Sequence, residues 1–377
     1  MKRFIFDSIL DEDNICNLEG ERDKIRKGVE QGLKMLVYGK RNTGKTSLIK
    51  NVIAKDWLKS NSNGFFMYVD LMGVVTMEQL SERMTLGFIR AYNQSFSMKS
   101  KFQSLLKVIK GIRPSVEIDE KGLPRLTFGV HPEMSNRSLM EIVEQVALLF
   151  KSGIPVLLVL DEFQDIANIE EAAALFRQNL EQLDPLLPVV VLGSKYHLLN
   201  QMFAQPKAPF FNWGTHVAFE AIDYQEYWEY MNDRFQMEGY TISLENACFL
   251  QDLMSRVPEA INRLCFALMV QGNSKGEITR EQILAGLSQL ASDRRTEPEY
   301  YLSRFTVGEQ KVIIALAQSE PVLKPQSKGF VQSVQLTTPG VRKIIIKLEN
   351  EAVIYREEKG YVLADPLLKQ HILHFRL

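Results

Sequence analysis

The stretch VYGKRNTGKTSL at positions 37–48 constrains the fold more than any other part of the 377-residue sequence. Within it, Gly39 is followed by four residues and then by Gly44, Lys45 and Thr46, which is the G-x-x-x-x-G-K-S/T spacing of a P-loop. Glycine lets the main chain turn sharply enough for backbone N–H groups to surround a chain of phosphates. A short apolar run precedes the loop and a helical pattern follows it. Strand, loop and helix therefore occur in the order that a P-loop requires.

The residues of this loop have distinct expected roles. Lys45 would place an ammonium group against the terminal phosphates, and the Thr46 hydroxyl would be a ligand of the Mg²⁺ that accompanies them. From Ser47 onward the pattern is helical, and the N-terminus of a helix attracts anions. An ordinary glycine turn with a surface lysine is the alternative interpretation. The predicted phosphate-binding residues are Gly39, Asn42, Thr43, Gly44, Lys45, Thr46 and Ser47.

A second informative stretch is GIPVLLVLDEFQDI, in which Ile154 to Leu160 is continuously apolar, as in a central parallel strand covered on both faces. Asp161 and Glu162 follow at its carboxyl end, where two adjacent acids are costly without a partner or a function. Beside a P-loop, Asp161 would hold Mg²⁺ and Glu162 would polarise the water that attacks the γ-phosphate. The alternative is that the acids cap the next helix. We predict Lys45, Asp161 and Glu162 as catalytic residues, and Thr46 and Asp161 as metal ligands.

Further apolar runs extend the predicted sheet. FFMYVD at 65–70 and PVVVLG at 188–193 are expected to be strands. Ser194 follows the second run and would lie beside the γ-phosphate, although a Gly-Ser pair also makes an ordinary turn. The segment near 114–130 has the alternation of a hairpin and interrupts the α/β pattern, so we interpret it as an insertion. From Ala221 to Leu290 only helical patterns are predicted.

The last eighty residues have a different pattern. A linker-like stretch, SDRRTEPEYY at 292–301, precedes them. Helices are expected at 307–318 and 338–350, with a turn-rich link between them, and two short strands are expected at 353–356 and 361–364. Helices followed by a β-hairpin are typical of a winged helix.

The second of these helices carries Arg342, Lys343 and Lys347 beside apolar residues. One interpretation is a recognition helix for double-stranded DNA, and the other is a solvated face on a packing module. From Tyr300 to Leu377 the chain has 11 Lys and Arg and 7 Asp and Glu, a net charge of +4, whereas the rest of the chain has −5. The net charge of −1 excludes a globally basic nucleic-acid binder, so the C-terminal segment is the candidate for contact with phosphate backbones.

The remaining composition indicates a cytoplasmic protein without a membrane partner. No apolar run approaches a membrane span, and the N-terminus turns acidic where a signal peptide would continue apolar. Cys16, Cys248 and Cys265 are far apart, which argues against a disulfide framework and a zinc site.

Taken together, these motifs resemble those of archaeal-type ATPases of the AAA+/STAND superfamily, which are related to origin-recognition-type initiators. The similar segments include YGKRNTGKTSLI, VLLVLDEFQDI, VVVLGSKYHLL, SRVPEAI and the terminal LTTPGVRKIIIKLENEAVIYREEKGYVLADPLL. The resemblance implies an α/β fold: a P-loop NTPase core with a parallel sheet at 1–218, an α-helical lid domain at 219–292 and a winged-helix domain at 300–377. It also implies ATP or ADP with Mg²⁺ as ligands. The residues that help to hold adenine would lie near Ile15, Cys16 and Asn17, and Pro258 and Ile261 of the lid would line the base.

The chain also departs from this family pattern. Where many relatives carry an arginine, the segment APFFNWGTH has no Lys or Arg, so no arginine finger can be identified. Pro258 stands in place of a lid arginine, with Arg256 and Arg263 close by. Because such a cation accelerates hydrolysis by about 10³ or more, we expect weak ATPase activity of the isolated chain.

Two functions remain open at this point. The chain is an ATPase that hydrolyses ATP slowly as a nucleotide-dependent switch coupled to the winged helix, or it is a DNA-binding regulatory protein in which nucleotide is mainly structural. A protein partner or self-association is open in either case.

Overall fold

The computed structural model describes residues 2–16, 18–95, 112–118, 124–130, 136–271 and 275–376. The chain forms two compact units. The sheet unit comprises Glu19–Gly39 and Lys45–Phe219, and the helical unit comprises Met1–Leu18, Lys40–Gly44 and Glu220–Leu377. The sheet unit has one large hydrophobic core, whereas the helical unit has two, one among its first helices and one in its C-terminal part.

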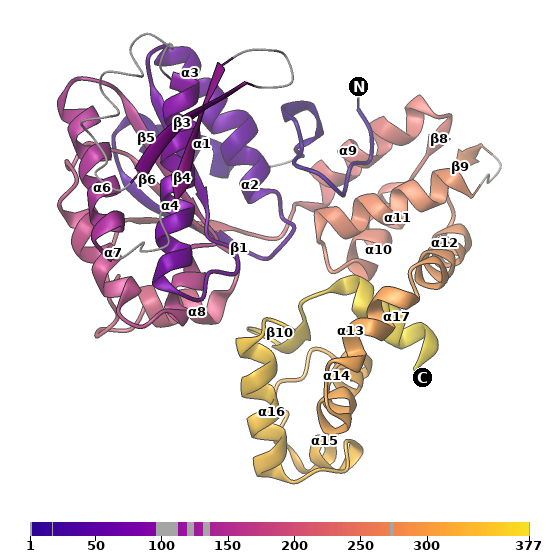
Figure 1. The fold of residues 1–377 in the computed structure, drawn as a ribbon. Helices are drawn as coiled ribbons and strands as arrows, with labels where there is room; N and C mark the ends of the chain where they lie inside the picture. Colours follow the sequence, from indigo (N-terminus) through magenta and orange to yellow (C-terminus); the bar gives the residue numbers. More distant parts are fainter. Residues whose placement is uncertain are drawn as a thin grey trace. The chain divides into compact units, whose positions relative to one another are not determined.

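A five-stranded parallel sheet forms the centre of the sheet unit, and its strand order is β2-β5-β6-β1-β7 (Figure 1). The strands are β1 (Lys34–Gly39), β2 (Phe65–Asp70), β5 (Val156–Asp161), β6 (Val189–Gly193) and β7 (Thr215–Phe219). Every residue of β5 is buried, as its apolar run predicts. Because the strands are parallel, their carboxyl ends meet at one edge of the sheet, which we call the carboxyl edge.

Helices cover this sheet. The elements are α1 (Glu19–Glu30), α2 (Lys45–Leu48), the π-helical turn η2 (Ile49–Ile53), α3 (Ala54–Ser60), α4 (Met77–Ser95), α6 (Asn136–Lys151), the 3-10 helix η3 (Phe163–Asn168), α7 (Ala172–Glu181) and α8 (Tyr196–Phe203). Helices α4 and α6 pack against each other and against β2 and β5, while α1 packs beside α3, β1 and β7. In the core, the Phe163 ring lies edge-on to Phe176 and Phe210, which fixes the chain just after β5.

The hairpin expected near 114–130 corresponds to β3 (Ile112–Ile118) and β4 (Pro124–Val130), which pair antiparallel. The turn expected between them lies outside the described residues.

The first part of the helical unit is built from η1 (Glu12–Asn14), α9 (Tyr224–Met237), α10 (Leu244–Leu253), α11 (Pro258–Val270) and α12 (Arg280–Asp293). Two short strands, β8 (Tyr240–Thr241) and β9 (Gly276–Glu277), pair parallel, so the expectation of helices alone after Ala221 was incomplete. A two-residue strand is too short to produce an alternating pattern. The N-terminal segment joins this part through Arg234, whose guanidinium donates to the carbonyls of Arg3 and Asp13.

The C-terminal part consists of α13 (Thr296–Ser303), α14 (Val307–Ser319), α15 (Lys328–Ser333), α16 (Thr338–Asn350), β10 (Ile354–Glu357), β11 (Gly360–Leu363) and α17 (Pro366–Phe375). Strands β10 and β11 form the predicted hairpin. The linker-like stretch at 292–301 was interpreted wrongly, because most of it lies in α12 and α13. Its charges form contacts within the fold: Glu299 bonds to His371 and Arg376, which hold α13 beside the end of the chain.

Among the described residues, no helix combines the length and the apolar character that crossing a membrane demands. The three cysteines are free thiols, with Cys265 buried and Cys16 and Cys248 partly buried. The cytoplasmic location stays a prediction.

Candidate functional site

The P-loop segment joins β1 to α2, as its sequence predicts. Gly39 has no room for a side chain, because a Cβ there would lie 2.7 Å from the Cβ of Phe219 on the neighbouring strand. Gly44 has a φ of 88°, a left-handed conformation that favours glycine. Lys45 is only 6% exposed, and its ammonium donates to the Gly39 carbonyl at 3.0 Å. The lysine side chain therefore folds back toward Gly39, the first glycine of the P-loop motif.

The side chains of Asn42 and Thr43 are engaged within the helical unit. The Asn42 amide donates to Glu259 Oε2 at 2.7 Å, and the Thr43 hydroxyl donates to the Lys40 carbonyl at 2.9 Å. Ser47 is buried in the first turn after Lys45. These side chains shape the loop, which agrees with a P-loop that contacts phosphates mainly through backbone N–H groups.

The structure brings together the two predicted metal ligands. The Thr46 hydroxyl donates to Asp161 Oδ2 at 2.7 Å, and the backbone N–H of Glu162 donates to Asp161 Oδ1 at 2.8 Å. The Asp161 carboxylate is 4% exposed and ends β5. A hydroxyl beside a carboxylate offers the hard oxygen atoms that Mg²⁺ prefers, so these residues fit the ion.

Sequence reasoning missed a further donor to this carboxylate. Tyr68 lies on β2, next to β5, and its hydroxyl donates to Asp161 Oδ2 at 2.7 Å. Burial and the nearby Asp161 carboxylate raise the pKa of Tyr68 well above its usual range, so the hydroxyl keeps its proton and remains a donor. The Lys50 ammonium lies 4.0 Å from the centre of the Tyr68 ring. A tyrosine on a strand otherwise rich in apolar residues was the only sequence signal.

Glu162 has a φ of 49° and accepts hydrogen bonds from two side chains. The Ser194 hydroxyl lies 2.8 Å from Oε2 and 3.1 Å from Oε1, and the Gln164 amide donates to Oε2 at 2.5 Å. Ser194 follows β6, the strand beside β5, so it lies at the carboxyl edge as expected. Its hydroxyl contacts the predicted catalytic acid.

A buried ion pair completes this edge. Lys195 Nζ lies 2.6 Å from Asp165 Oδ1, and the side chains of these residues are 18% and 4% exposed. The other Asp165 oxygen accepts from the Gly73 N–H at 2.8 Å. We call these residues the edge network. It consists of two side-chain clusters that the Glu162 N–H joins by donating to Asp161: Thr46, Tyr68 and Asp161 form one, and Glu162, Gln164, Asp165, Ser194 and Lys195 form the other.

The predicted adenine contacts all lie in the helical unit. Ile15 directly follows η1, the Cys16 thiol contacts the Glu226 carbonyl at 3.7 Å, and Asn17 lies outside the described residues. Burial raises the pKa of Cys16 to about 12, so it remains a neutral thiol. Pro258 begins α11, and its carbonyl accepts from the Tyr227 hydroxyl at 3.3 Å. Ile261 has no exposed surface and belongs to the core, so its expected contact with the base is not supported.

The two arginines near Pro258 are engaged within the helical unit. Arg263 forms ion pairs with Glu259 and Asp7. Arg256 donates to the Ile222 carbonyl, and its guanidinium lies 4.2 Å from the centre of the Tyr224 ring. Neither contact identifies an arginine finger.

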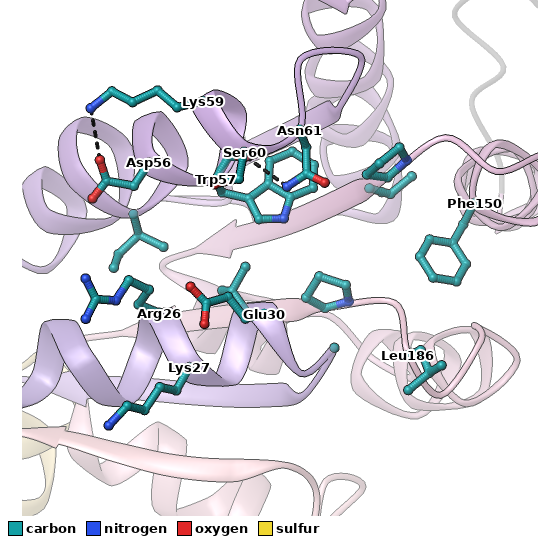
Figure 2. A pocket seen from close by; sticks show the side chains of 16 residues that line it. Arg26, Lys27, Glu30, Asp56, Trp57, Lys59, Ser60, Asn61, Phe150 and Leu186 are labelled. Carbon is teal, nitrogen blue, oxygen red and sulfur yellow. Dashed lines mark hydrogen bonds and ion pairs between the residues drawn. The ribbon is translucent and has the colours of Figure 1, made fainter.

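A hollow of about 720 Å³ lies in another part of the sheet unit. Figure 2 shows α1 residues such as Arg26 and Glu30 on one side of it and Trp57 of α3 on the other. Val156, which begins β5, and Pro188, which precedes β6, also line it, so it lies at the amino-terminal edge of the sheet. None of the predicted site residues lines this hollow. We therefore locate the candidate site by the buried polar contacts at the carboxyl edge, and not by the volume of a hollow.

Known proteins share this fold. Residues 299–374 match the model of a probable winged helix domain. No curated protein sequence matches the chain. A Walker-type ATPase of Pyrococcus abyssi is similar in structure, with a TM-score of 0.66 and 17% sequence identity over 98% of this chain and 99% of that chain.

Two proteins of Aeropyrum pernix are also similar. The ORC1 protein, in complex with DNA, has a TM-score of 0.50 and 12% identity over 100% of this chain and 98% of its own. The ORC2 protein in its ADP form has a TM-score of 0.51 and 12% identity over 98% and 97%. These similarities confirm the predicted fold class: an α/β core of the P-loop NTPase fold with a parallel sheet, followed by helices and a C-terminal winged helix.

Proposed function

We propose that this chain binds ATP with Mg²⁺ and hydrolyses it slowly, as a nucleotide-dependent switch coupled to its C-terminal winged helix. We further propose that it works in three parts, with the core at 1–218, the helical lid at 219–292 and the winged helix at 300–377. The similar fold of the Walker-type ATPase of Pyrococcus abyssi supports this assignment.

The observation that carries the proposal is the contact of Thr46 with Asp161, with Glu162 as the next residue. Thr46 and Asp161 would hold Mg²⁺, which neutralises phosphate charge when bound. Lys45 would contact the terminal phosphates. Glu162 would accept a proton from the attacking water while the water oxygen bonds to the γ-phosphorus and the bond to the bridging oxygen of ADP breaks. The products are ADP and phosphate.

A contact within the helical unit supports coupling to the winged helix. Lys40 belongs to the P-loop, and its ammonium lies 2.7 Å from Glu357 Oε1 and 4.7 Å from the centre of the Tyr355 ring. Glu357 and Tyr355 lie on β10, the first strand of the winged-helix hairpin. Any shift of the loop backbone on binding phosphates would therefore reach this hairpin directly.

A DNA-binding regulatory protein with a mainly structural nucleotide is the second candidate function. Arg342 and Lys343 are exposed on α16, and Ile346, on the same helix, is 49% exposed. Such a surface suits the phosphates and base edges of double-stranded DNA. The ORC1 protein, which has a similar fold, is in complex with DNA. A protein partner or a second copy of the chain remains a further possible occupant of this surface.

The decisive experiment measures ATP hydrolysis by the purified chain, with and without duplex DNA, for the wild type and Glu162→Gln. The amide is nearly isosteric but cannot accept the proton, so we expect turnover to fall by about 100-fold or more while ATP still binds. Glu357→Gln removes the carboxylate that pairs with Lys40 and should reduce the response of turnover to DNA. Equal turnover of Glu162→Gln and wild type would remove Glu162 from its proposed role. Full ATP binding with no wild-type turnover would favour the structural-nucleotide alternative.

A further inference from the structure

Glu162 depends on side-chain contacts for its orientation. Its backbone is left-handed, and it precedes η3 without capping it through its side chain. No regular helix or strand therefore fixes the direction of its carboxylate. A general base must lie within hydrogen-bond reach of the proton that it removes, so something else has to hold this group.

Gln164 meets this requirement. It is 0% exposed, and its amide nitrogen donates to Glu162 Oε2 at 2.5 Å and to Asp165 Oδ1 at 3.2 Å. Its amide oxygen accepts from the Ser194 N–H at 3.2 Å. The amide NH₂ group therefore faces two carboxylate acceptors and the amide oxygen faces an N–H donor, which fixes the orientation of the amide. Gln164 connects the acid after β5 to the segment after β6.

The neighbouring strand leaves space for this side chain. A Cβ at Gly193, the last residue of β6, would lie 2.7 Å from the Gln164 amide oxygen. Any larger residue at 193 would displace the amide or the strand. Gly193 therefore gives the buried glutamine room to reach the Ser194 backbone.

We propose that Gln164 is a positioning residue for Glu162, holding its carboxylate in the orientation in which it accepts a proton from water. The inference rests on the proposed ATPase function. Gln164 donates to Oε2, and the Ser194 hydroxyl is also closer to Oε2 than to Oε1. Oε1 is thus the oxygen that we assign to accept the proton of the attacking water. Because Gln164 also binds the Ser194 backbone, movement of the segment after β6 would change the direction of Glu162.

A purely structural role for the buried amide makes different predictions. A structural amide would stabilise the fold, and its loss would lower stability in any background. A positioning residue acts only through Glu162, so its loss should have no effect on turnover once Glu162 can no longer act as the base. A double-mutant cycle separates these roles.

The test compares single-turnover ATP hydrolysis and ATP affinity for wild type, Gln164→Leu, Glu162→Gln and the double variant. Leucine removes the amide at similar volume. We expect the single-turnover rate constant of Gln164→Leu to fall by about 10- to 100-fold, because misplacement by about 1 Å can cost that much, with ATP Kd changed by less than about twofold. The double variant should hydrolyse ATP at the rate of Glu162→Gln alone. Gln251→Leu, which removes another fully buried amide in the helical unit, should keep wild-type turnover.

Because Gln164 is fully buried, Gln164→Asn provides a second variant that retains the amide on a side chain one methylene shorter. It should also lose turnover, since it cannot reach Glu162. A wild-type single-turnover rate constant in either folded variant, or additive losses in the cycle, would overturn the positioning role while the ATPase proposal stands. A wild type without turnover would overturn the proposed hydrolysis and this role together. In that case the wild type and Glu162→Gln would show the same absence of turnover.

Discussion

The carboxyl edge of the sheet and the outer face of α16 both carry charged residues, but they use them differently. At the carboxyl edge, Asp161 and Asp165 are 4% and 3% exposed, and each carboxylate accepts several hydrogen bonds. On α16, Arg342 and Lys343 are exposed. Burying a charge is costly unless it is paired, so convergent buried acids indicate a built site, whereas exposed cations occur on most protein surfaces. The edge network is therefore the stronger indication of function.

The largest expected effect comes from removing a cation at the buried site. Lys45→Ala deletes the ammonium that donates to the Gly39 carbonyl and that we propose to contact the terminal phosphates. Hydrogen bonds to charged groups contribute about 1.5–3 kcal/mol, so ATP Kd should rise by about 10- to 100-fold. Isothermal titration calorimetry with ATP and Mg²⁺ measures this change.

Lys55→Ala provides the matched control, because Lys55 is an exposed lysine on the helix that follows the P-loop. Its ATP affinity should equal that of the wild type. If both variants bind ATP as the wild type does, the buried site is not a phosphate site. The carboxyl edge would then be no stronger an indication of function than the exposed face of α16.

An intermediate effect is expected on α16. Charge reversal of Arg342 and Lys343 should weaken binding to duplex DNA by about tenfold at moderate salt and reduce the slope of log K against log salt by about 2. Fluorescence anisotropy with a labelled duplex, repeated over a series of salt concentrations, measures both quantities.

Lys347 is the internal comparison on the same helix. Its ammonium lies 2.8 Å from Glu309 Oε1, so part of its charge is already neutralised within the winged helix. Lys347→Ala should change DNA affinity less than Arg342→Ala. A wild type that binds no DNA at low salt would show that the exposed cations form a solvated face.

Much of the sheet unit could be predicted from sequence because its signals are local. An apolar run ending in Asp161 and Glu162 specifies both a buried strand and the residues at its end. The P-loop spacing likewise places Gly39 at the end of β1 and Lys45 at the start of a helix. These features require no knowledge of which strands are neighbours.

The partners of those acids could not be predicted, because they depend on strand order. Tyr68 reaches Asp161 because β2 lies beside β5, and Ser194 and Lys195 reach η3 because β6 lies on the other side of β5. Gln164 lies in the quoted motif, yet its role depends on the position of the Ser194 backbone. Sequence spacing therefore identified the acids, whereas the three-dimensional fold identified what orients them.

The smallest expected effect concerns Glu309, the partner that distinguishes Lys347 from its exposed neighbours. Glu309 Oε2 accepts from the Thr306 N–H in a capping box at the start of α14, and Oε1 accepts from Lys347. Glutamine can still cap the helix, so Glu309→Gln should remove only the ion pair and lower unfolding stability by a few tenths of a kcal/mol. Glu309→Ala also removes the carboxylate that accepts from the Thr306 N–H in the capping box and should cost about 1 kcal/mol.

The pH dependence of this difference identifies the charge as its cause. The hydrogen bond from Lys347 lowers the pKa of Glu309 below its ordinary value. A carboxyl group with a lowered folded-state pKa contributes stability above its unfolded pKa of about 4.3 and loses it as pH falls through the folded value. Urea unfolding should thus show a higher free energy of unfolding for wild type than for Glu309→Gln at pH 7, and this difference should shrink as pH falls below about 4.3. A difference that does not change with pH would mean that packing, and not charge, holds α14 to α16, and Lys347 would then count among the cations available to DNA.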